Sequence, residues 1–242
     1  MGKTHAPKTV NEMKAETMQA RLQKMLILRA QHEANIDEVH VVLQGGNSKT
    51  GTLVYTTSFM PVVDCPNCAH CKGKCYDLRN DCWRPTVQND RARNSAIHRL
   101  DPERYWKEVE ESCKLNNANA LRINVGGDVT LEDMQIIYDM SLRNPSIDYL
   151  FFTKNYDDAN YFLDQINGNL PENLHMIFSR WPNMECDNRY NMPESHILWK
   201  DGSTTAPQYG AYFCQGDCTE CLLAGEGCWT LKRNEHVVFN AH

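Results

Sequence analysis

The feature that most constrains the fold of this chain is the regular alternation of short apolar runs with helical segments in its second half. The apolar runs are rich in β-branched and aromatic residues and are predicted as strands at 121–125, 147–152, 174–178, 196–199 and 236–239. Helices are predicted between them at 131–143, with Thr130 as the cap, and at 157–166. Because such strands pair in parallel and the helices cover the sheet, we expect an α/β open sheet or barrel.

The first half of the chain is predicted to contain further helices and the first strands of the sheet. A long amphipathic helix is predicted at 11–35, opened by a capping box of Thr9 and Glu12. Two β-rich runs and two helices follow, with Asp101 as the cap of the second helix, at 39–43, 53–63, 87–100 and 102–116. Without a repeat or linker, we predict one α/β domain over residues 1–205 and a cysteine-rich C-terminal extension over 206–242 packed on the same domain.

Composition limits the expected cellular compartment of the protein and its expected partners. No apolar run approaches the ~20 residues needed to cross a bilayer, and the N-terminus lacks the apolar stretch of a secretory signal. We therefore expect a cytoplasmic protein with no membrane partner. The net charge of −6 does not favour non-specific nucleic-acid binding. One basic group near the first cysteines is interpreted as pairing with thiolates or acids rather than as a nucleic-acid groove: Lys72, Lys74, Arg79, Arg84, Arg91, Arg93, Arg99 and Arg104.

Eleven cysteines dominate the chemistry of the sequence. A disulfide framework is not expected in the cytosol, where thiols are kept reduced, and the count is odd. Nine of the eleven fall into two short windows, the arrangement of metal ligands. The first window holds Cys65, Cys68, Cys71, Cys75 and Cys82, and the second holds Cys214, Cys218, Cys221 and Cys228. Cys113 and Cys186 lie apart and are interpreted as small filling residues.

The spacing within the windows favours iron–sulfur clusters over zinc. Structural zinc modules usually present two Cys-x-x-Cys pairs a dozen or more residues apart, whereas the first window crowds its cysteines together as ferredoxin-type runs do. We predict two [4Fe-4S] clusters, with zinc as the alternative. The predicted ligands are Cys65, Cys68, Cys71, Cys75, Cys214, Cys218, Cys221 and Cys228. Whether Cys68 or Cys82 completes the first site stays open.

Unusual residues follow four of the predicted strands. Functional groups of parallel α/β folds collect at the carboxyl ends of the strands, so these segments should share one edge with the first cysteine window. Asp128 and Lys154 are the candidate catalytic residues; each also has an ordinary alternative, as a helix cap and as a solvated lysine. The candidate cofactor contacts are Gly126, Gly127, Asp128, Thr153 and Ser179.

At these residues the chain resembles the phage gene product eighty-eight family, uncharacterised proteins of phages and bacteria. The resemblance covers most of the chain after the first helix. Its most specific part is the order of the cysteines, with Tyr76 directly after Cys75 and Trp229 directly after Cys228. Shorter matches lie at 46–49, 93–94, 127–128 and 153–154. Cys68 and Cys82 are additions to the family's first three cysteines, Cys65, Cys71 and Cys75.

More distantly, a cysteine trio after an early strand, followed by a Gly-Gly-acid loop, is similar to the radical S-adenosylmethionine barrel. This resemblance implies a partial (β/α) barrel in which three cysteines hold a four-iron cluster and the fourth iron binds S-adenosylmethionine. Cys65, Cys71 and Cys75 would be the ligands, and the loop at 126–128 would contact the cofactor. The usual Cys-x-x-x-Cys-x-x-Cys order is absent there and occurs instead at Cys214, which we interpret as the start of an auxiliary site.

Three functions follow from these patterns. The favoured one is a radical S-adenosylmethionine-type enzyme acting on a small molecule or a nucleic acid and reduced by an electron donor. The second is a non-catalytic iron–sulfur protein that binds nucleic acid or a protein partner. The third is zinc in both sites without chemistry. The sequence does not specify the substrate, the donor or the oligomeric state.

Overall fold

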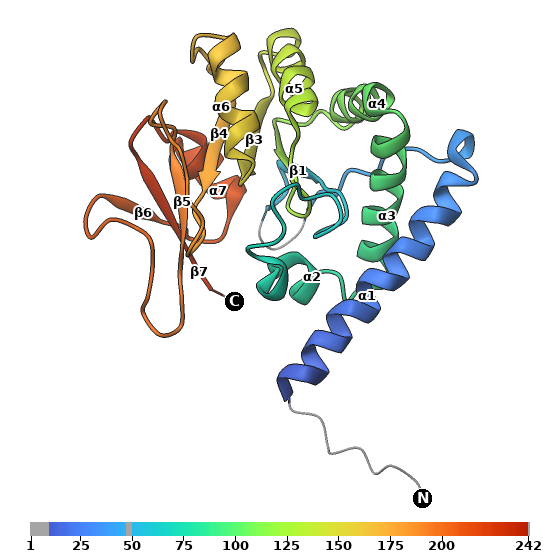
Figure 1. The fold of residues 1–242 in the computed structure, drawn as a ribbon. Coiled ribbons are helices and arrows are strands. Elements are labelled where there is room, and N and C mark those ends of the chain that lie inside the picture. The colour runs from blue at the N-terminus through green and yellow to red at the C-terminus, as the bar shows by residue number, and fades with distance from the viewer. Residues whose placement is uncertain (1–9, 47–49, 242) are drawn as a thin grey trace, which may run out of the picture.

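A seven-stranded sheet forms the centre of the molecule, as a computed structural model describing residues 10–46 and 50–241 shows (Figure 1). The strand order is β1-β2-β3-β4-β5-β7-β6, and each neighbouring pair is parallel. The strands are β1 (Val54–Thr57), β2 (Ala120–Ile123), β3 (Asp148–Thr153), β4 (Leu174–Ser179), β5 (Glu194–Leu198), β6 (Ala211–Phe213) and β7 (His236–Asn240).

The expected α/β class with parallel pairing is therefore confirmed, and the sheet is open. β1 and β6 stand at opposite ends of the strand order and are not paired with each other in the described part of the chain. The molecule is thus not a closed barrel. β6 was absent from the strands expected from sequence, because three residues with partly exposed side chains give too short a pattern.

The helices form close to their expected positions. Asp101 accepts a hydrogen bond from the Arg104 amide, and Thr130 forms a capping box with Asp133, as expected. The helices are α1 (Val10–Glu33), α2 (Tyr76–Asn80), α3 (Pro85–Leu100), α4 (Pro102–Leu115), α5 (Leu131–Arg143), α6 (Tyr156–Gln165) and α7 (Cys218–Ala224), with short 3-10 turns η1 (Ile36–Glu38), η2 (Lys72–Lys74) and η3 (Gly227–Trp229). Thr9 lies outside the described residues, so its capping box with Glu12 stays a prediction.

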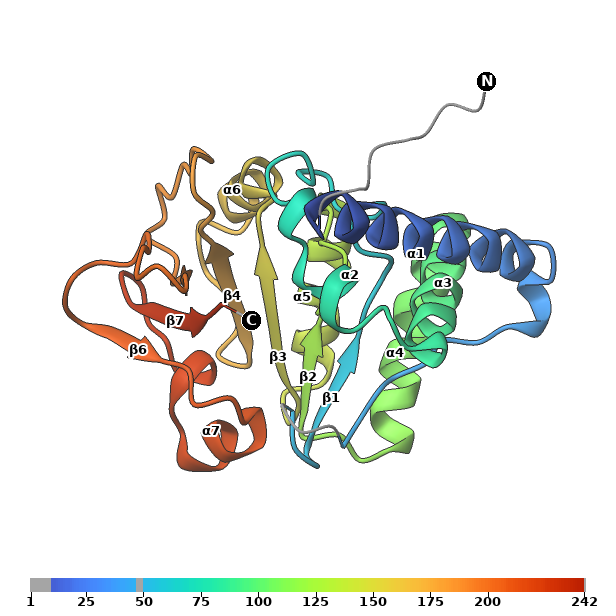
Figure 2. The same ribbon diagram turned by 90° about the horizontal axis from the view of Figure 1, so that it is seen from below.

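The two faces of the sheet have different covers. Alternate residues of a strand point to opposite faces, and one set, including Leu121, Tyr149 and Met176, packs against α4, α5 and α6 in the main core. The other set, including Ala120 and Leu150, packs against the C-terminal segment. That smaller core is made by Val54, Ala120, Leu150, Ile177, Cys221 and Trp229. Figure 2 shows the helices α4, α5 and α6 and the C-terminal helix α7 around the strands of the sheet.

The run at 39–43 was expected to be a strand and is not one. Its alternating Val39, Val41 and Leu43 do pack against the main core. However, its backbone bonds with side chains: the Val42 amide donates to Asn94 Oδ1 at 2.9 Å, and Asn94 Nδ2 donates to the Val42 carbonyl at 3.0 Å. An antiparallel bridge from Gln44 to Thr56 is its link to β1. The strand prediction was wrong because side chains of α3 and α4 take the place of a neighbouring strand.

Helix α1 lies along α3 and covers the segment that carries the first cysteines (Figures 1 and 2). Its Met25 is fully buried in a third core with Met60, Leu78 and Cys82. The Arg21 guanidinium donates to the carbonyls of Leu78 and Arg79, at 3.0 and 2.7 Å, and so satisfies the end of α2. Within the described ranges, no helix combines the length and apolar composition that crossing a bilayer requires.

A cluster of polar contacts joins α4 to the end of α5 and should make stability depend on pH. Burial on its own raises the pKa of Glu110, but hydrogen bonds from Arg143, Lys114 and Asn144 lower it to about 2. A carboxyl group with a lowered folded-state pKa contributes stability that is complete above its unfolded-state value and is lost as pH falls toward the folded-state value. Glu110→Gln should therefore destabilise the protein at pH 7 by roughly 1 kcal/mol, after allowance for solvent screening.

The measurement is urea unfolding of the wild type and the variant at pH 7 and near pH 2.5, where the difference should shrink. Glu111→Gln, at an exposed position beside it on α4, is the matched control. A difference that is the same at both pH values would show that Glu110 does not act through its charge.

Candidate functional site

The candidate residues meet at the carboxyl edge of the sheet. Thr57, Ile123 and Phe151 are in register on β1, β2 and β3, so the segments after these strands leave from the same edge. The first cysteines follow β1, the Gly-Gly-Asp loop follows β2 and Lys154 follows β3. The structure therefore gathers segments that are far apart in the sequence.

Hydrogen bonds lock the segment after β1 against the loop after β2. Ser58 Oγ accepts from the amides of Val125 and Gly126, at 3.1 and 3.3 Å. The Phe59 amide donates to the Gly126 carbonyl at 2.9 Å, and the Asp128 amide donates to the Asp64 carbonyl at 2.8 Å. Since Asp64 immediately precedes Cys65, the cysteine loop begins in contact with Asp128.

Two more bonds bring in the end of β3. Asn67 Nδ2, inside the cysteine loop, donates to the Lys154 carbonyl at 2.8 Å. The Lys154 amide donates to Asp128 Oδ2 at 2.9 Å. Three of the four predicted segments are thus joined directly. Ser179, at the end of β4, is held by a different contact, with its carbonyl accepting from the Tyr156 hydroxyl at 2.5 Å.

The first cysteine loop is a series of tight turns. The Cys68 amide donates to the Cys65 carbonyl and the Cys71 amide to the Cys68 carbonyl, both at 3.2 Å. Burial and then the charge of Asp128 raise the pKa of Cys65, and the thiols of Cys75 and Cys71 raise it further. Burial also raises the pKa of Cys75 to about 11, with a contribution from Cys71 and an opposing one from Lys154. Cys65, Cys71 and Cys75 therefore form one electrostatically connected group beside a lysine.

The two remaining cysteines of this window are placed differently. Cys82 is fully buried, and its thiol lies 3.5 Å from Asp77 Oδ2. Cys68 is half-buried in the loop, and its charge raises the pKa of Cys71, whose largest contribution is burial. Cys68 is thus the more accessible fourth thiol, while Cys82 is already bonded to a carboxylate.

The two glycines make room for neighbouring side chains. A Cβ on Gly126 would lie 2.0 Å from Asp77 Oδ2, and Asp77 forms a buried ion pair with Arg91 at 2.7 Å. Gly127 has φ +85, and a Cβ there would lie 2.8 Å from the Cβ of Phe59. These positions let the loop pack against α2 and the segment after β1. Their contact with a cofactor stays a prediction.

Asp128 is engaged by the backbone around it. Its Oδ1 accepts from the Val129 amide at 2.8 Å, and its Oδ2 accepts from Lys154. Burial raises the pKa of Asp128, while these hydrogen bonds and the Lys154 charge act against the increase. The Thr153 side chain also hydrogen-bonds to this carboxylate. Of the roughly four lone-pair sites of a carboxylate, one is therefore left for a further donor, and the side chain positions the loop.

The second cysteine set lies on the opposite face of the sheet from α4–α6. Cys218 and Cys221 are on α7, which is capped by Asp217, and Cys228 is in η3. Burial raises the pKa of Cys228 to about 12, the Arg122 charge lowers it, and the thiols of Cys214, Cys218 and Cys221 raise it again. All four cysteines therefore share one neighbourhood.

Arg122 is a candidate residue of this second set that sequence reasoning missed. It projects from β2, and its guanidinium lies 3.7 Å from Cys218 Sγ. Its side chain also lies over the Phe152 ring, 5.3 Å from the centroid. The available signal was a cation inside an otherwise apolar strand, Leu121-Arg122-Ile123.

Asn124 was also missed, at the point where β2 ends. Its side chain is 6% exposed, and neither its amide nitrogen nor its amide oxygen has a hydrogen-bond partner within the described residues. Its backbone has φ 55, in the left-handed region that asparagine tolerates. Because a buried polar group without a partner costs about 1–3 kcal/mol, this amide is a place where a bound molecule would find both a donor and an acceptor.

Comparison with known proteins gives one match. The model of the family described as Gene product 88 matches residues 25–228, which is most of the chain, and the chain belongs to that family. No curated protein and no solved structure matches. The match includes the first cysteine window, the carboxyl edge and the second cysteine set up to Cys228.

The close fit at Gly126 predicts a strong effect of one methyl group. Gly126→Ala should destabilise the protein by about 2–4 kcal/mol, because the new Cβ displaces Asp77 from its buried pairing with Arg91. Gly73→Ala, in the exposed part of the first cysteine loop, meets no atom within 4 Å and should change stability by less than about 0.5 kcal/mol. Urea unfolding of both variants measures the contrast, and equal midpoints would contradict the packing described here.

Proposed function

We propose that this member of the gene product 88 family is an iron–sulfur enzyme of the radical S-adenosylmethionine type. Cys65, Cys71 and Cys75 would hold a four-iron cluster at the carboxyl edge, and the second cysteine set would hold an auxiliary cluster. The observation that carries the proposal is the bonding of the cysteine loop to Asp128 and Lys154. This bonding gathers thiols, a carboxylate and a lysine at the edge where parallel α/β folds place their ligands.

The thiols of the first loop suit a cluster with three protein ligands. Cys65, Cys71 and Cys75 influence one another electrostatically. Backbone amides of Val62 and Leu78 lower the pKa of Cys65 and Cys75 against the larger effect of burial, which is how hydrogen bonds to sulfur tune a cluster. Cys82 fits this set poorly, since its thiol is in contact with Asp77.

The cofactor would find suitable polar groups at the same carboxyl edge of the sheet. S-adenosylmethionine carries an amino and a carboxylate group, and Asn124 offers an unpartnered donor and acceptor at the end of β2. Asp128 can accept one more hydrogen bond from an amino group. With cluster and cofactor bound, the pair supplies radical chemistry. The residues of this chain would bind and orient the cofactor and shield it from solvent.

The second cysteine set is proposed as an auxiliary cluster. Four thiols in one neighbourhood make a complete ligand set. Arg122 places a cation beside Cys218, and a nearby positive charge stabilises the more negative, reduced form of a cluster. A structural or electron-carrying cluster fits this position, where α7 and η3 pack on the strands.

One observation favours a second candidate, a non-catalytic iron–sulfur protein. The charge of Cys68 acts on Cys71, so Cys68 is near enough to compete as a fourth ligand of the first cluster. The nucleic-acid version of this candidate is weakened by the basic residues themselves. Arg91, Arg99 and Arg104 form ion pairs with Asp77, Glu33 and Glu108, in line with the pairing that we favoured.

Anaerobic purification tests the cluster content. The protein should be brown and contain about eight irons per chain, as two four-iron clusters require. Cys71→Ser should remove about half of the iron, whereas Cys68→Ser should leave the content unchanged, because the trio suffices. Cys113→Ala, at a buried position in the main core, controls for the loss of a cysteine as such.

Zinc in place of iron would contradict the proposal as a whole. Loss of the first cluster in Cys68→Ser would instead support four protein ligands and the non-catalytic candidate. Iron content and electron paramagnetic resonance spectra of the same samples separate these results.

Addition of S-adenosylmethionine to the reduced protein tests the enzymatic part. The electron paramagnetic resonance spectrum of the first cluster should change, and 5′-deoxyadenosine should be released. Asn124→Leu should weaken the spectral response by about tenfold or more, since a ligand then loses both of its hydrogen bonds to the amide. An iron-loaded wild type that shows neither response is not an enzyme of this type.

A further inference from the structure

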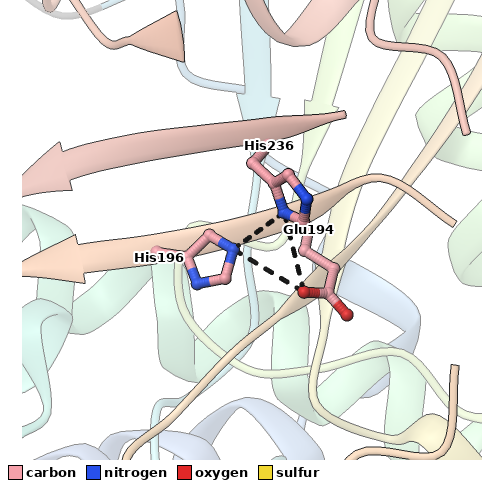
Figure 3. A group of neighbouring side chains, drawn as sticks. All are labelled: Glu194, His196 and His236. Carbon is pink, nitrogen blue, oxygen red and sulfur yellow. Dashed lines mark hydrogen bonds and ion pairs between the residues drawn. The ribbon is translucent and has the colours of Figure 1, made fainter. Parts of the chain in front are cut away.

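A second kind of metal-binding group lies further along the same sheet. Glu194, His196 and His236 each bring one ligand atom to within 4.8 Å of the other two (Figure 3). None of these residues belongs to the cysteine sets, and sequence reasoning assigned them no role. A neighbouring carboxylate and two imidazoles are ligands that Zn²⁺ and similar divalent ions take.

The register of two parallel strands creates the group. Glu194 and His196 are two residues apart on β5, so their side chains point to the same face. His236 pairs with Glu194 across the ladder between β5 and β7. Because Glu194 is also in register with Phe178, and Phe178 with Thr153, the group lies at the level of the carboxyl end of β3.

The distances fit one ion. His196 Nε2 lies 3.1 Å from His236 Nδ1 and 3.6 Å from Glu194 Oε2, and His236 Nδ1 lies 3.7 Å from the same oxygen. Two ligand atoms held about 2.0–2.1 Å from a tetrahedral ion are roughly 3.3–3.4 Å apart. Small adjustments of side chains would place all three donors on a common centre.

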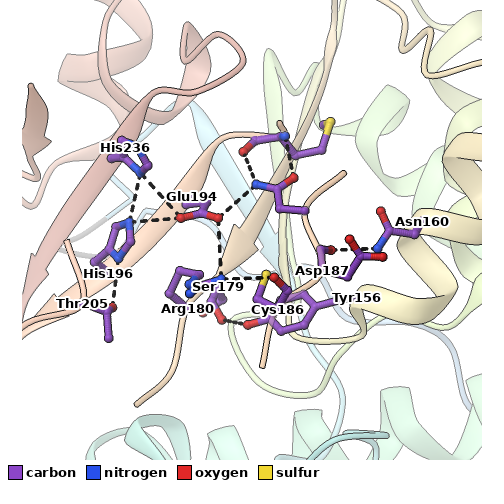
Figure 4. A network of polar contacts seen from close by, with 12 residues as sticks. Tyr156, Asn160, Ser179, Arg180, Cys186, Asp187, Glu194, His196, Thr205 and His236 are labelled. Atoms are coloured by element: carbon purple, nitrogen blue, oxygen red, sulfur yellow. Dashed lines mark hydrogen bonds and ion pairs between the residues drawn. The ribbon is translucent and has the colours of Figure 1, made fainter. Parts of the chain in front are cut away.

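The atoms that face away from this centre are held by other groups. His196 Nδ1 lies 2.9 Å from Thr205 Oγ1, and a bond from Nδ1–H to this hydroxyl leaves the lone pair of Nε2 directed at the group. Glu194 Oε1 accepts from Asn188 Nδ2 at 3.0 Å. The same oxygen lies 3.8 Å from Arg180 (Figure 4), so Oε2 is the oxygen left for an ion. Metal ligands are commonly oriented in this way by a bond on their second atom.

When His196 carries its proton on Nδ1, a single further proton cannot satisfy His196 Nε2, His236 Nδ1 and Glu194 Oε2 together. With His196 protonated on Nδ1, its Nε2 and the Glu194 carboxylate face each other with lone pairs. A single hydrogen on His236 Nδ1 can serve only part of the group. One divalent cation would satisfy the three donors together.

The group is accessible from one side. The side chain of His196 is 1% exposed, that of Glu194 14% and that of His236 23%. Three protein ligands leave at least one coordination position for water or another molecule, which is the arrangement of catalytic rather than structural zinc sites.

We propose that Glu194, His196 and His236 form a site for one Zn²⁺-like divalent ion, separate from the cysteine sets. The two imidazoles and one carboxylate oxygen are its protein ligands. This inference goes beyond the proposed function and does not rest on it.

Zinc titration of the anaerobically reconstituted full chain tests the site. Reconstitution fills the cysteine sets first, and zinc X-ray absorption then identifies the neighbours of the added ion. The wild type should bind one Zn²⁺ with nitrogen and oxygen neighbours at about 2.0–2.1 Å, whereas cysteine-bound zinc would show sulfur at about 2.3 Å. His236→Gln and Glu194→Gln should each weaken this binding by at least about 100-fold, more than loss of an orienting partner does.

His40→Gln is the matched control, because His40 also lies beside a glutamate, at 3.4 Å from Glu108, but on the surface. It should bind zinc as the wild type does. Circular dichroism and iron content test whether the variants are folded. If one of the two variants fails to fold, the other still tests the site. A wild type that binds no zinc with nitrogen and oxygen neighbours, or unchanged binding of such zinc in both variants, overturns the proposal. If the cysteine sets bind zinc or are empty, added zinc that has nitrogen and oxygen neighbours still identifies the Glu194, His196 and His236 site.

Discussion

The buried ion pair between Asp77 and Arg91 is the interaction on which the candidate site depends. Arg91 donates from Nε and from one terminal nitrogen to the two oxygens of Asp77, at 3.1 and 2.7 Å, with both residues nearly inaccessible to solvent. A bidentate pair of this kind fixes orientation as well as distance. It fastens α2, which directly follows Cys75, to α3, and it fits against the bare backbone of Gly126. Removing one partner from such a pair costs about 3–5 kcal/mol.

The cysteine loop is thereby held at both of its ends. Its beginning is tied to the carboxyl edge by Asp64 and Asp128, its middle by Asn67 and Lys154, and its end by α2. Helix α1 closes over this arrangement from outside through Met25. A short loop rich in thiols has little core of its own, so these external contacts decide where its sulfur atoms lie.

The two cysteine sets are arranged around the same sheet, and each lies near a cation. Lys154 acts on the first set from the end of β3, and Arg122 acts on the second from the face of β2. Arg122 lies on β2 and Lys154 directly follows the neighbouring strand β3, and the buried amide of Asn124 follows two residues after Arg122. The Glu194, His196 and His236 group extends the row of candidate functional side chains along the sheet to β5 and β7.

Much of this organisation could be predicted from local patterns. The parallel α/β class, the caps at Asp101 and Thr130 and the gathering of segments after β1, β2 and β3 follow from hydrophobic periodicity and the pairing rule for alternating strands and helices. The run at 39–43 misled, because its alternating valines resemble a strand while Asn94 bonds its backbone. The Gly126–Gly127 pair was recognised as unusual from the sequence. The close approach of Asp77 and Phe59, which leaves no room for a side chain at these positions, is a feature of tertiary packing.

The sequence by itself determined the class of fold, the common edge and the two windows of cysteines, since each is encoded in neighbouring residues. Only the tertiary structure decided that β7 enters between β5 and β6, that Arg122 faces the second cysteine set, and that His236 reaches His196 across 40 positions of the chain. The physical reason is register. Which residues of two distant strands lie opposite each other depends on how whole layers pack, and no local pattern of side chains contains that information.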